Sequence, residues 1–399
     1  MAGGLMQLVA YGAQDIYLSG NPQITFFKVV YRRHTNFSIE AIEQTFTGNA
    51  DFGRKVQSTI SRNGDLIWKV YLQVDLPEVT KTAGTFGWAR WIGHVLIKQV
   101  ELEIGGQRID RQYGDWMTIW SELTLPAEKQ TGFFNMIGNV SDLYTQAVTV
   151  NAQRLYIPLQ LYFCRNVGLA LPLIALQYHE VKITLEFRAV TECYITDDGT
   201  APDATPSLTS ATLYVDYIYL DTDERRRFAQ LSHEYLIEQL QFTGDESVSN
   251  TSVRIRLNFN HPCKEFIWVS QLDSVVAANV NEWANYTNAA GFAGNNLLVD
   301  AKLLLNGHDR FSTRQAAYFN LVQPWQHHTR IPSTGIYVYS FALNPEDHQP
   351  SGSANLSRID NATFQMTLST SNAQKIRVYA VNYNVLRIMS GMGGLAYSN

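Results

Sequence analysis

The chain has 399 residues, of which 17% are charged and 12% aromatic, and its formal net charge is −5. This length predicts two or three domains, because a single hydrophobic core stops growing near roughly 250–300 residues. Low charge with many aromatic side chains excludes a disordered chain, and the negative balance argues against general nucleic-acid binding.

Cysteine usage and the apolar runs indicate a soluble chain from a reducing compartment. Cys164, Cys193 and Cys263 are far apart and form no CxxC pair, so no disulfide framework is expected. The first ten residues lack the basic start and long apolar run of a secretory signal. The longest apolar stretch, at 169–176, is far shorter than the roughly 20 residues that span a bilayer.

Strands dominate the expected secondary structure. Apolar and polar residues alternate along five runs, at 68–76, 99–104, 181–188, 253–259 and 364–368. Such alternation places the apolar side chains on one face, as a half-buried antiparallel strand requires. The chain is therefore predicted to be all-β.

One helix is expected between the two halves of the chain. Asp221 and Glu224 have the spacing of a helix capping pair and open a helical pattern that continues to Ser232. The basic run at 225–227 lies beside Asp221, Asp223 and Glu224. This favours a salt-bridged helix surface over nucleic-acid binding.

The two halves of the chain repeat each other. Five short segments of the first half recur in the second half in the same order, which predicts a duplication. The shrinking offset between partners places insertions in the first half at Leu125–Arg154 and Cys193–Ser210, in surface loops. The pairs are Glu43–Gly48 with Glu238–Gly244, Asp65–Trp68 with Glu265–Trp268, Leu102–Gly106 with Leu303–Gly307, Ile183–Leu185 with Met366–Leu368, and Val215–Tyr217 with Val381–Tyr383.

The duplication predicts two similar domains. Each repeat has room for roughly eight strands, which make a jelly roll or a similar two-sheet sandwich, and the pattern alone does not separate these topologies. The expected organisation is an N-terminal arm at 1–24, a first sandwich at 25–220, a helical linker at 221–234 and a second sandwich at 235–399.

The sequence predicts no catalytic residue, no cofactor-binding residue and no metal ligand. It contains no GxSxG, HExxH or Walker motif. Glu101 and Glu103 could share one strand face at the separation of a glycosidase carboxylate pair, but a solvated or interface face is the favoured interpretation. The adjacent His327 and His328 would point to opposite faces of a strand, so a structural or surface role is expected.

Two asparagines are candidate glycosylation sites. Asn139 and Asn285 stand in Asn-x-Ser/Thr sequences within expected long loops. The glycine-rich Gly391–Gly394 resembles part of a phosphate loop, but too few residues follow it to form a helix. We therefore expect a flexible or docking tail there.

Several segments resemble the major capsid proteins of nucleocytoplasmic large DNA viruses, of the iridovirus, phycodnavirus and marseillevirus type. The most specific is Asn344-Pro-Glu-Asp-His-Gln-Pro-Ser-Gly352, followed by 355–362. The resemblance also covers segments near both termini and at the junction of the repeats, at 8–28, 31–37, 221–230 and 379–397.

This resemblance implies a double jelly roll, two tandem eight-stranded sandwiches, and a homotrimer that forms a pseudo-hexagonal capsomer. Such capsomers tile an icosahedral virion shell, assembled in the host cytoplasm, and act without catalysis or cofactor. The implied partners are neighbouring capsomers, minor capsid proteins and penton proteins. Contact with an internal membrane would be indirect, and no direct contact with nucleic acid is implied.

Three further expectations accompany this interpretation. The alternative function is a carbohydrate-binding or carbohydrate-processing β-sandwich, which the strand pattern also allows. Within the capsid interpretation, the arm at 1–24 precedes the first repeat and is expected to contact minor capsid proteins or a neighbouring capsomer from the inner face. The chain is also shorter than many members of the family, so its outward loops are expected to be trimmed.

Overall fold

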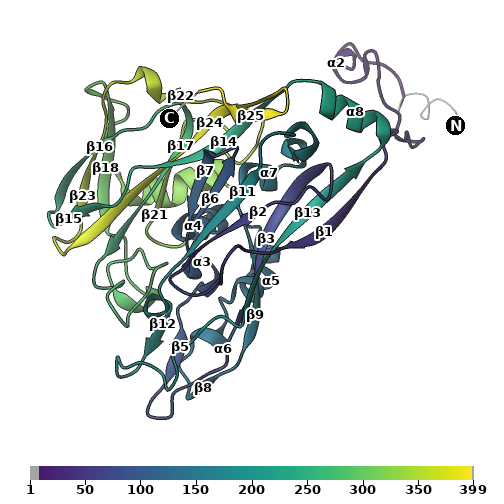
Figure 1. Ribbon diagram of the computed structural model, residues 1–399. Coiled ribbons are helices and arrows are strands. Elements are labelled where there is room, and N and C mark those ends of the chain that lie inside the picture. Colours follow the sequence, from purple (N-terminus) through teal and green to yellow (C-terminus); the bar gives the residue numbers. More distant parts are fainter. Residues whose placement is uncertain (1–8, 398–399) are drawn as a thin grey trace, which may run out of the picture. The chain divides into compact units, whose positions relative to one another are not determined.

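A computed structural model describes residues 9–397, and strands predominate in it (Figure 1). The predicted arm is therefore described only from residue 9, and its residues 1–8 lie outside the described residues. The chain up to Asn36 is a unit of its own, separate from the unit that begins at Phe37. This first unit contains one short helix, α2 (Ile16–Ser19), and nearly all of its described side chains are exposed.

Two antiparallel sheets form a first sandwich from the strands between Phe37 and Leu220. One sheet has the order β1 (Phe37–Gln44), β13 (Ser210–Leu220), β3 (Leu66–Leu76) and β10 (Leu171–Pro172), and β9 (Gln153–Pro158) also pairs with β3. The other has the order β2 (Lys55–Thr59), β11 (Val181–Phe187), β6 (Ile97–Ile104) and β7 (Gln107–Tyr113). Two short pairs are separate from these sheets, β5 (Phe86–Trp88) with β12 (Tyr194–Thr196), and β4 (Val79–Thr80) with β8 (Thr149–Val150).

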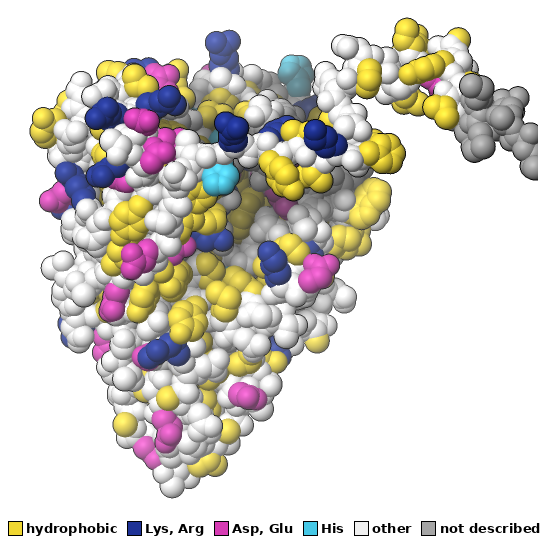
Figure 2. Space-filling view, turned by 90° about the vertical axis from the view of Figure 1, so that its right-hand side faces the viewer, with side chains coloured by type: hydrophobic (Ala, Val, Ile, Leu, Met, Phe, Trp, Pro, Cys, Tyr) yellow, Lys and Arg dark blue, Asp and Glu magenta, His cyan; other side chains and the backbone are white. Residues whose placement is uncertain are grey.

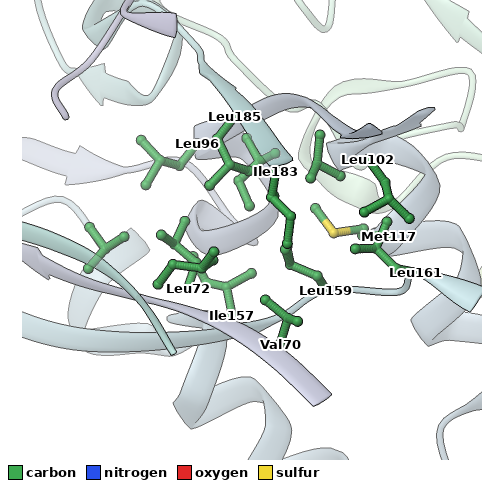
Figure 3. Packing of buried hydrophobic residues seen from close by; sticks show 14 of the residues in the cluster. Val70, Leu72, Leu96, Leu102, Met117, Ile157, Leu159, Leu161, Ile183 and Leu185 are labelled. Atoms are coloured by element: carbon green, nitrogen blue, oxygen red, sulfur yellow. The ribbon is translucent and has the colours of Figure 1, made fainter. Parts of the chain in front are cut away.

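The core of this sandwich is built by the inward residues of the alternating strands. Val70 and Leu72 of β3 meet Leu102 of β6 and Ile183 and Leu185 of β11, and all five are buried (Figure 3). The alternation seen in the sequence thus places one face of each strand in the core, where burial of each aliphatic side chain contributes roughly 1.5–3 kcal/mol.

A second sandwich follows in the C-terminal half (Figure 1). One sheet has the order β14 (His233–Phe242), β24 (Gln374–Met389), β17 (Pro262–Leu272) and β21 (Ile336–Ser340), with the short strands β15 (Glu246–Val248), β22 (Ala354–Asn355) and β25 (Met392–Leu395) attached. The other has the order β16 (Ser252–Leu257), β23 (Ala362–Leu368), β18 (Leu298–Leu305) and β19 (His308–Asp309), and β20 (Arg314–Gln315) pairs with β18.

The strand orders confirm the predicted duplication. All five pairs of repeated segments fall on or directly beside strands at equivalent places in the two sandwiches, β1 and β14, β3 and β17, β6 and β18, β11 and β23, and β13 and β24. In each sandwich the first strand lies beside a strand from the end of the repeat, which is the arrangement of a jelly roll. The protein is therefore a double jelly roll, as expected.

The structure contains the one helix that the sequence predicted and several that it did not. The predicted linker helix is α8 (Thr222–Gln230), and the Asp221 carboxylate accepts a hydrogen bond from the Glu224 backbone N–H as its cap. Most helices were not predicted. They are α3 (Ile92–Leu96), α4 (Gly114–Thr124), α5 (Ala127–Ile137), α6 (Ser141–Tyr144), α7 (Tyr162–Arg165) and α9 (Gln323–His327), with the π-helical turn η5 (Tyr318–Val322) before α9 and the 3₁₀ turns η1 (Val167–Leu169), η2 (Leu173–Ala175), η3 (Val190–Glu192), η4 (Ala290–Phe292) and η6 (Leu356–Arg358).

The glycine-rich C-terminal segment is also ordered differently from the expectation. Met392–Leu395 is strand β25, which pairs with the end of β24 in a hairpin. Gly391 sits in the turn with a φ of 80°, a left-handed conformation that glycine adopts without strain. Of the expected flexible or docking tail, the flexible alternative was wrong as far as residue 395, because β25 docks on β24.

Candidate functional site

Helix α4 joins the two sandwiches into one body. Its residues Trp116, Ile119, Trp120 and Leu123 are buried and pack against β17, β21 and β24 of the second sandwich. Strand β17 is consequently buried on both faces, one against its own core and one against α4. Because large aromatic side chains bury much apolar surface, this contact holds the sandwiches in a fixed arrangement.

Buried charges reinforce the same interface. Asp115 Oδ2, on the first turn of α4, lies 3.0 Å from Arg377 Nη1 on β24, and Asp245 lies 2.9 Å from Nε of the same guanidinium. Burial would lower the pKa of Arg377, but the two carboxylates outweigh it and raise the pKa well above its usual value. Arg377 is buried, Asp115 is half-buried and Asp245 is exposed, so the two carboxylates compensate the buried guanidinium charge.

A loop of the second sandwich contacts one end of the first sandwich through hydrogen bonds and a cation–π interaction. Asn281 Nδ2 donates hydrogen bonds to the carbonyl oxygens of Thr191 and Tyr194, at 2.8 and 2.7 Å. The Arg188 guanidinium lies 3.8 Å from the ring centre of Trp283. Asn281 has a φ of 47°, a left-handed conformation that asparagine tolerates better than most residues.

The two histidines predicted to be structural do not lie on a strand. His327 ends helix α9 and His328 follows it. The buried His328 ring bridges two carboxylates, with Nε2 2.8 Å from Glu265 and Nδ1 2.9 Å from Glu346. Burial alone would lower the pKa of His328, but the two carboxylates outweigh it and raise the pKa to about 9.

The same bridge fixes the loop that carries Asn344-Pro-Glu-Asp-His-Gln-Pro-Ser-Gly352. A second buried group holds this loop nearby, because Lys264 Nζ donates to the Asp347 carbonyl and lies 2.7 Å from Glu238 Oε1. Burial would raise the pKa of Glu238, but His348, Arg165 and Lys264 lower it to about 2. The loop is thus held by charged side chains from strands β14 and β17 of the second sandwich.

Glu101 and Glu103 have different surroundings. Glu101 is 5% exposed, and Arg111 Nε donates a hydrogen bond to it at 2.6 Å, while Lys55 and Arg108 lie within 4 Å. Glu103 is half-buried. The expectation was a solvated or interface face. The solvated alternative was wrong for Glu101, whose buried charge is compensated by three basic neighbours.

Further chemistry is not supported within residues 9–397. No group of three or more His, Cys, Asp or Glu side chains in this range could hold a metal ion. The three cysteines are free, and burial raises the pKa of the Cys164 and Cys193 thiols to about 12 and that of Cys263 still further. None of the helices in the same range is long and apolar enough to cross a bilayer.

The two candidate glycosylation sites differ in accessibility. Asn285 is completely buried, and its amide donates to Glu282 and Ala289 while accepting from Thr287. A glycan cannot reach that nitrogen in the folded chain, so the structure argues against this site. Asn139 is half-buried in the turn between α5 and α6 and remains a prediction.

Large apolar side chains are exposed at several places on the body (Figure 2). One hollow of about 530 Å³ on the first sandwich is lined by Tyr71, Tyr156, Met136 and Pro158, and Tyr71 stacks on Tyr214. A second exposed group, on the second sandwich, is Leu321, Val322, Trp325 and Leu343. Exposed apolar surface of this kind is typical of protein contacts.

Comparison with known proteins gives matches along nearly the whole chain. Residues 25–221 match the family model "Major capsid protein N-terminus", and residues 224–394 match "Large eukaryotic DNA virus major capsid protein". The major capsid protein of Pyramimonas orientalis virus is 57% identical over 426 residues, covering all of both chains. That of Phaeocystis pouchetii virus is 51% identical over 520 residues, again covering all of both.

A solved structure has the same fold. The chain described as "PBCV-1 virus capsid, quasi-atomic model" is 40% identical and superimposes with a TM-score of 0.80, covering 94% of this chain and all of that one. The alignment to the Phaeocystis virus protein leaves 520 − 399 = 121 positions without a residue of this chain. The chain is therefore shorter than that relative, and the trimming of its outward loops stays a prediction.

Proposed function

The chain belongs to the family of large eukaryotic DNA virus major capsid proteins, and on this premise we propose that three copies form a pseudo-hexagonal capsomer. Its role is structural, in the shell of the virion. The observation that supports a pseudo-hexagonal capsomer is the duplication of the jelly roll within one chain. Two equivalent jelly rolls per chain give six in a trimer, so a threefold particle presents nearly sixfold sides to its neighbours.

The rigid junction between the jelly rolls supports this proposal. A tile keeps its outline only if its two jelly rolls cannot rotate against each other. The apolar contact of α4 and the Asp115–Arg377 pair both cross that junction. The comparisons favour this structural role over the carbohydrate-binding alternative, and we propose that the chain has no enzymatic activity.

The domain limits remain part of the proposal. We place the first jelly roll at 25–220, the linker at 221–234 and the second jelly roll at 235–399. The family matches at 25–221 and 224–394 and the position of α8 support this division. Residues 25–36 belong to the same unit as the arm, so the strands of the first jelly roll begin only at Phe37.

Partners and place of assembly are proposed from family membership. We propose contacts with neighbouring capsomers, minor capsid proteins and penton proteins, indirect contact with an internal membrane, no direct contact with nucleic acid, and assembly in the host cytoplasm. The arm at 1–24 would contact a minor capsid protein or a neighbouring capsomer, and the exposure of Tyr11, Ile16, Tyr17 and Leu18 supports this. Deleting residues 1–24 should leave trimers intact and impair shell assembly. Normal virions built from the shortened chain would refute the proposed contact.

Light scattering after size exclusion tests the capsomer. A trimer of this 45.1 kDa chain has a mass of 3 × 45.1 = 135.3 kDa. A folded particle near that mass is the expected result. A folded chain that stays at 45.1 kDa at every concentration and ionic strength tested would count against self-association as the basis of its function.

A further inference from the structure

A cavity of about 370 Å³ lies where the two sandwiches meet. Residues of α4, of α5 and of the segment before α3 line it from the first sandwich (Figure 1). Residues of the loops at 284–292 and 330–333 line it from the second sandwich. Aromatic side chains form part of its wall, namely Trp91, Phe134 and Phe292. A cavity of this volume, with apolar walls and a few polar groups, fits a small organic molecule.

Arg90 also lines this cavity, and two aromatic rings hold its side chain in place. The central carbon of its guanidinium lies 4.5 Å from the ring centre of Tyr144 and 4.8 Å from that of Phe292. Within residues 9–397, no hydrogen bond or ion pair joins Arg90 to another side chain or to the backbone. The rings therefore position the charge and leave its five N–H donors without a protein acceptor.

A second lining residue, Tyr286, has a polar group without a partner. Its side chain is 1% exposed, and its hydroxyl is buried with no hydrogen-bond partner in the described part of the chain. A buried hydroxyl in this state is costly, and nearly all such groups in folded proteins are paired. A hydrogen-bonding group supplied from the cavity would remove that cost.

The charges around the cavity favour an anion. Glu122 Oε2 lies 3.4 Å from Arg330 Nη2 and accepts a hydrogen bond from the Ser333 backbone N–H at 3.3 Å. Glu122 and Arg330 thus compensate each other, and Arg90 is the remaining charged residue that lines the cavity. One uncompensated guanidinium matches one carboxylate, which it can bind through two parallel hydrogen bonds.

The backbone is strained at two aromatic residues of the wall. Trp91 has a φ of 61° and Phe292 has a φ of 62°, and bulky side chains rarely adopt this left-handed conformation. Residues held in such conformations cluster at sites that bind ligands. Here both of them line the same cavity, one from each sandwich.

We propose that this cavity binds a small organic carboxylate. Its carboxylate pairs with Arg90, its apolar body packs against Trp91, Phe134 and Phe292, and a polar group hydrogen-bonds to the Tyr286 hydroxyl. Because the wall comes from both sandwiches, the bound molecule stabilises the junction in its folded arrangement. The inference concerns one chain and does not depend on the proposed self-association.

Benzoate is a suitable probe, and saturation-transfer nuclear magnetic resonance on the full chain measures its binding. Arg90→Gln should weaken benzoate binding at least about tenfold, because it removes the charged partner of the carboxylate. Arg256→Gln is the matched control, since Arg256 is an exposed arginine of β16 and its loss changes the net charge equally. The control should leave the affinity unchanged.

Three results would overturn the inference. The first is a folded wild-type chain that does not bind benzoate at millimolar concentration. The second is equal weakening in Arg90→Gln and Arg256→Gln, which would show that benzoate responds only to the net charge. The third is equal affinity for benzoate, for inorganic phosphate and for the neutral benzyl alcohol, because the site would then recognise neither a carboxylate nor an apolar body.

Tyr286→Phe tests the hydroxyl separately. The variant keeps the buried ring, so it should fold with an unchanged or higher melting temperature, because the lost hydroxyl has no partner in residues 9–397. A ligand that carries a polar group, such as 3-hydroxybenzoate, should bind this variant about threefold more weakly than the wild type. A lower melting temperature with unchanged affinity would show that the hydroxyl serves the fold, and would overturn its place in the site.

Discussion

Asp115 of the first jelly roll and Arg377 of the second form an ion pair at 3.0 Å across their junction. Arg377 is 5% exposed and also pairs with Asp245. Charges inside an interface are costly when one partner is removed, because the remaining charge has lost its water. The pair therefore ties the orientation of α4 to the orientation of β24.

Asp115→Asn should lower the free energy of unfolding by about 2 kcal/mol, because Arg377 keeps only Asp245 as a charged partner at the junction. Denaturant unfolding measures this change. The matched control is Asp75→Asn, which breaks a 2.6 Å pair with the exposed Arg154 and should have little effect, as exposed pairs contribute little. Equal losses in the two variants would show that the junction pair is no more important than a surface pair.

Gly114→Ala should destabilise the chain by about 3 kcal/mol or more. A Cβ at this position would lie 2.2 Å from the carbonyl oxygens of His94 and Ile97, which are backbone atoms that cannot move freely. Gly132→Ala in α5 is the matched control, because no atom lies within 4 Å of its added Cβ. In a helix interior this change should stabilise by about 0.5–1 kcal/mol. Thermal unfolding of both variants distinguishes a steric limit at Gly114 from a general effect of glycine.

The His328 bridge should make stability depend on pH. Its folded pKa of about 9 lies above the ordinary value of 6.5, so its stabilisation is complete below pH 6.5 and is lost as the pH rises through 9. The loss should amount to roughly 3 kcal/mol at most. The pKa of Glu346 is lowered by His328 and Thr329 against the effect of burial, so its contribution is instead lost as the pH falls below 4.5.

Nuclear magnetic resonance of the His328 ring, in full-length protein, measures this titration. Glu346→Gln removes one of the two carboxylates and should move the midpoint to lower pH. An ordinary midpoint in the wild type, or no movement in the variant, would contradict the bridge.

Asn281→Asp should make local opening easier at the end of the first jelly roll that Asn281 contacts. An aspartate cannot donate hydrogen bonds to the carbonyl oxygens of Thr191 and Tyr194, and it places a charge at a position that is 2% exposed. Local opening of residues 188–196 should become easier by about 3 kcal/mol, seen as faster hydrogen exchange there. Asn306→Asp is the control, because Asn306 has a similar φ of 51° in an exposed hairpin turn.

The strands were predictable because their signal is local. In β3, β6, β11, β16 and β23 one face is buried and the other is less so, and this leaves an alternating pattern in the sequence. Strand β17 shows less alternation because α4 buries its second face. Equivalent strands kept enough shared sequence for the duplication to be read directly.

Helix α4 could have been found and was missed. Trp116, Ile119, Trp120 and Leu123 follow the spacing i, i+3, i+4, i+7 of one helix face. The ion pairs could not be predicted, because Asp115 and Arg377 are more than 250 residues apart and only the fold brings them together. The burial of Asn285 was also missed, because its long loop was assumed to be exposed.

The three thiols have a consequence for the life of the particle. Cys193 and Cys263 are buried and burial raises the pKa of both thiols, so neither presents a ready nucleophile in the folded chain. Cys164 is half-buried and lines the hollow beside Tyr71. We therefore expect Cys193 and Cys263 to stay reduced when the particle passes from a reducing cell into oxygenated water.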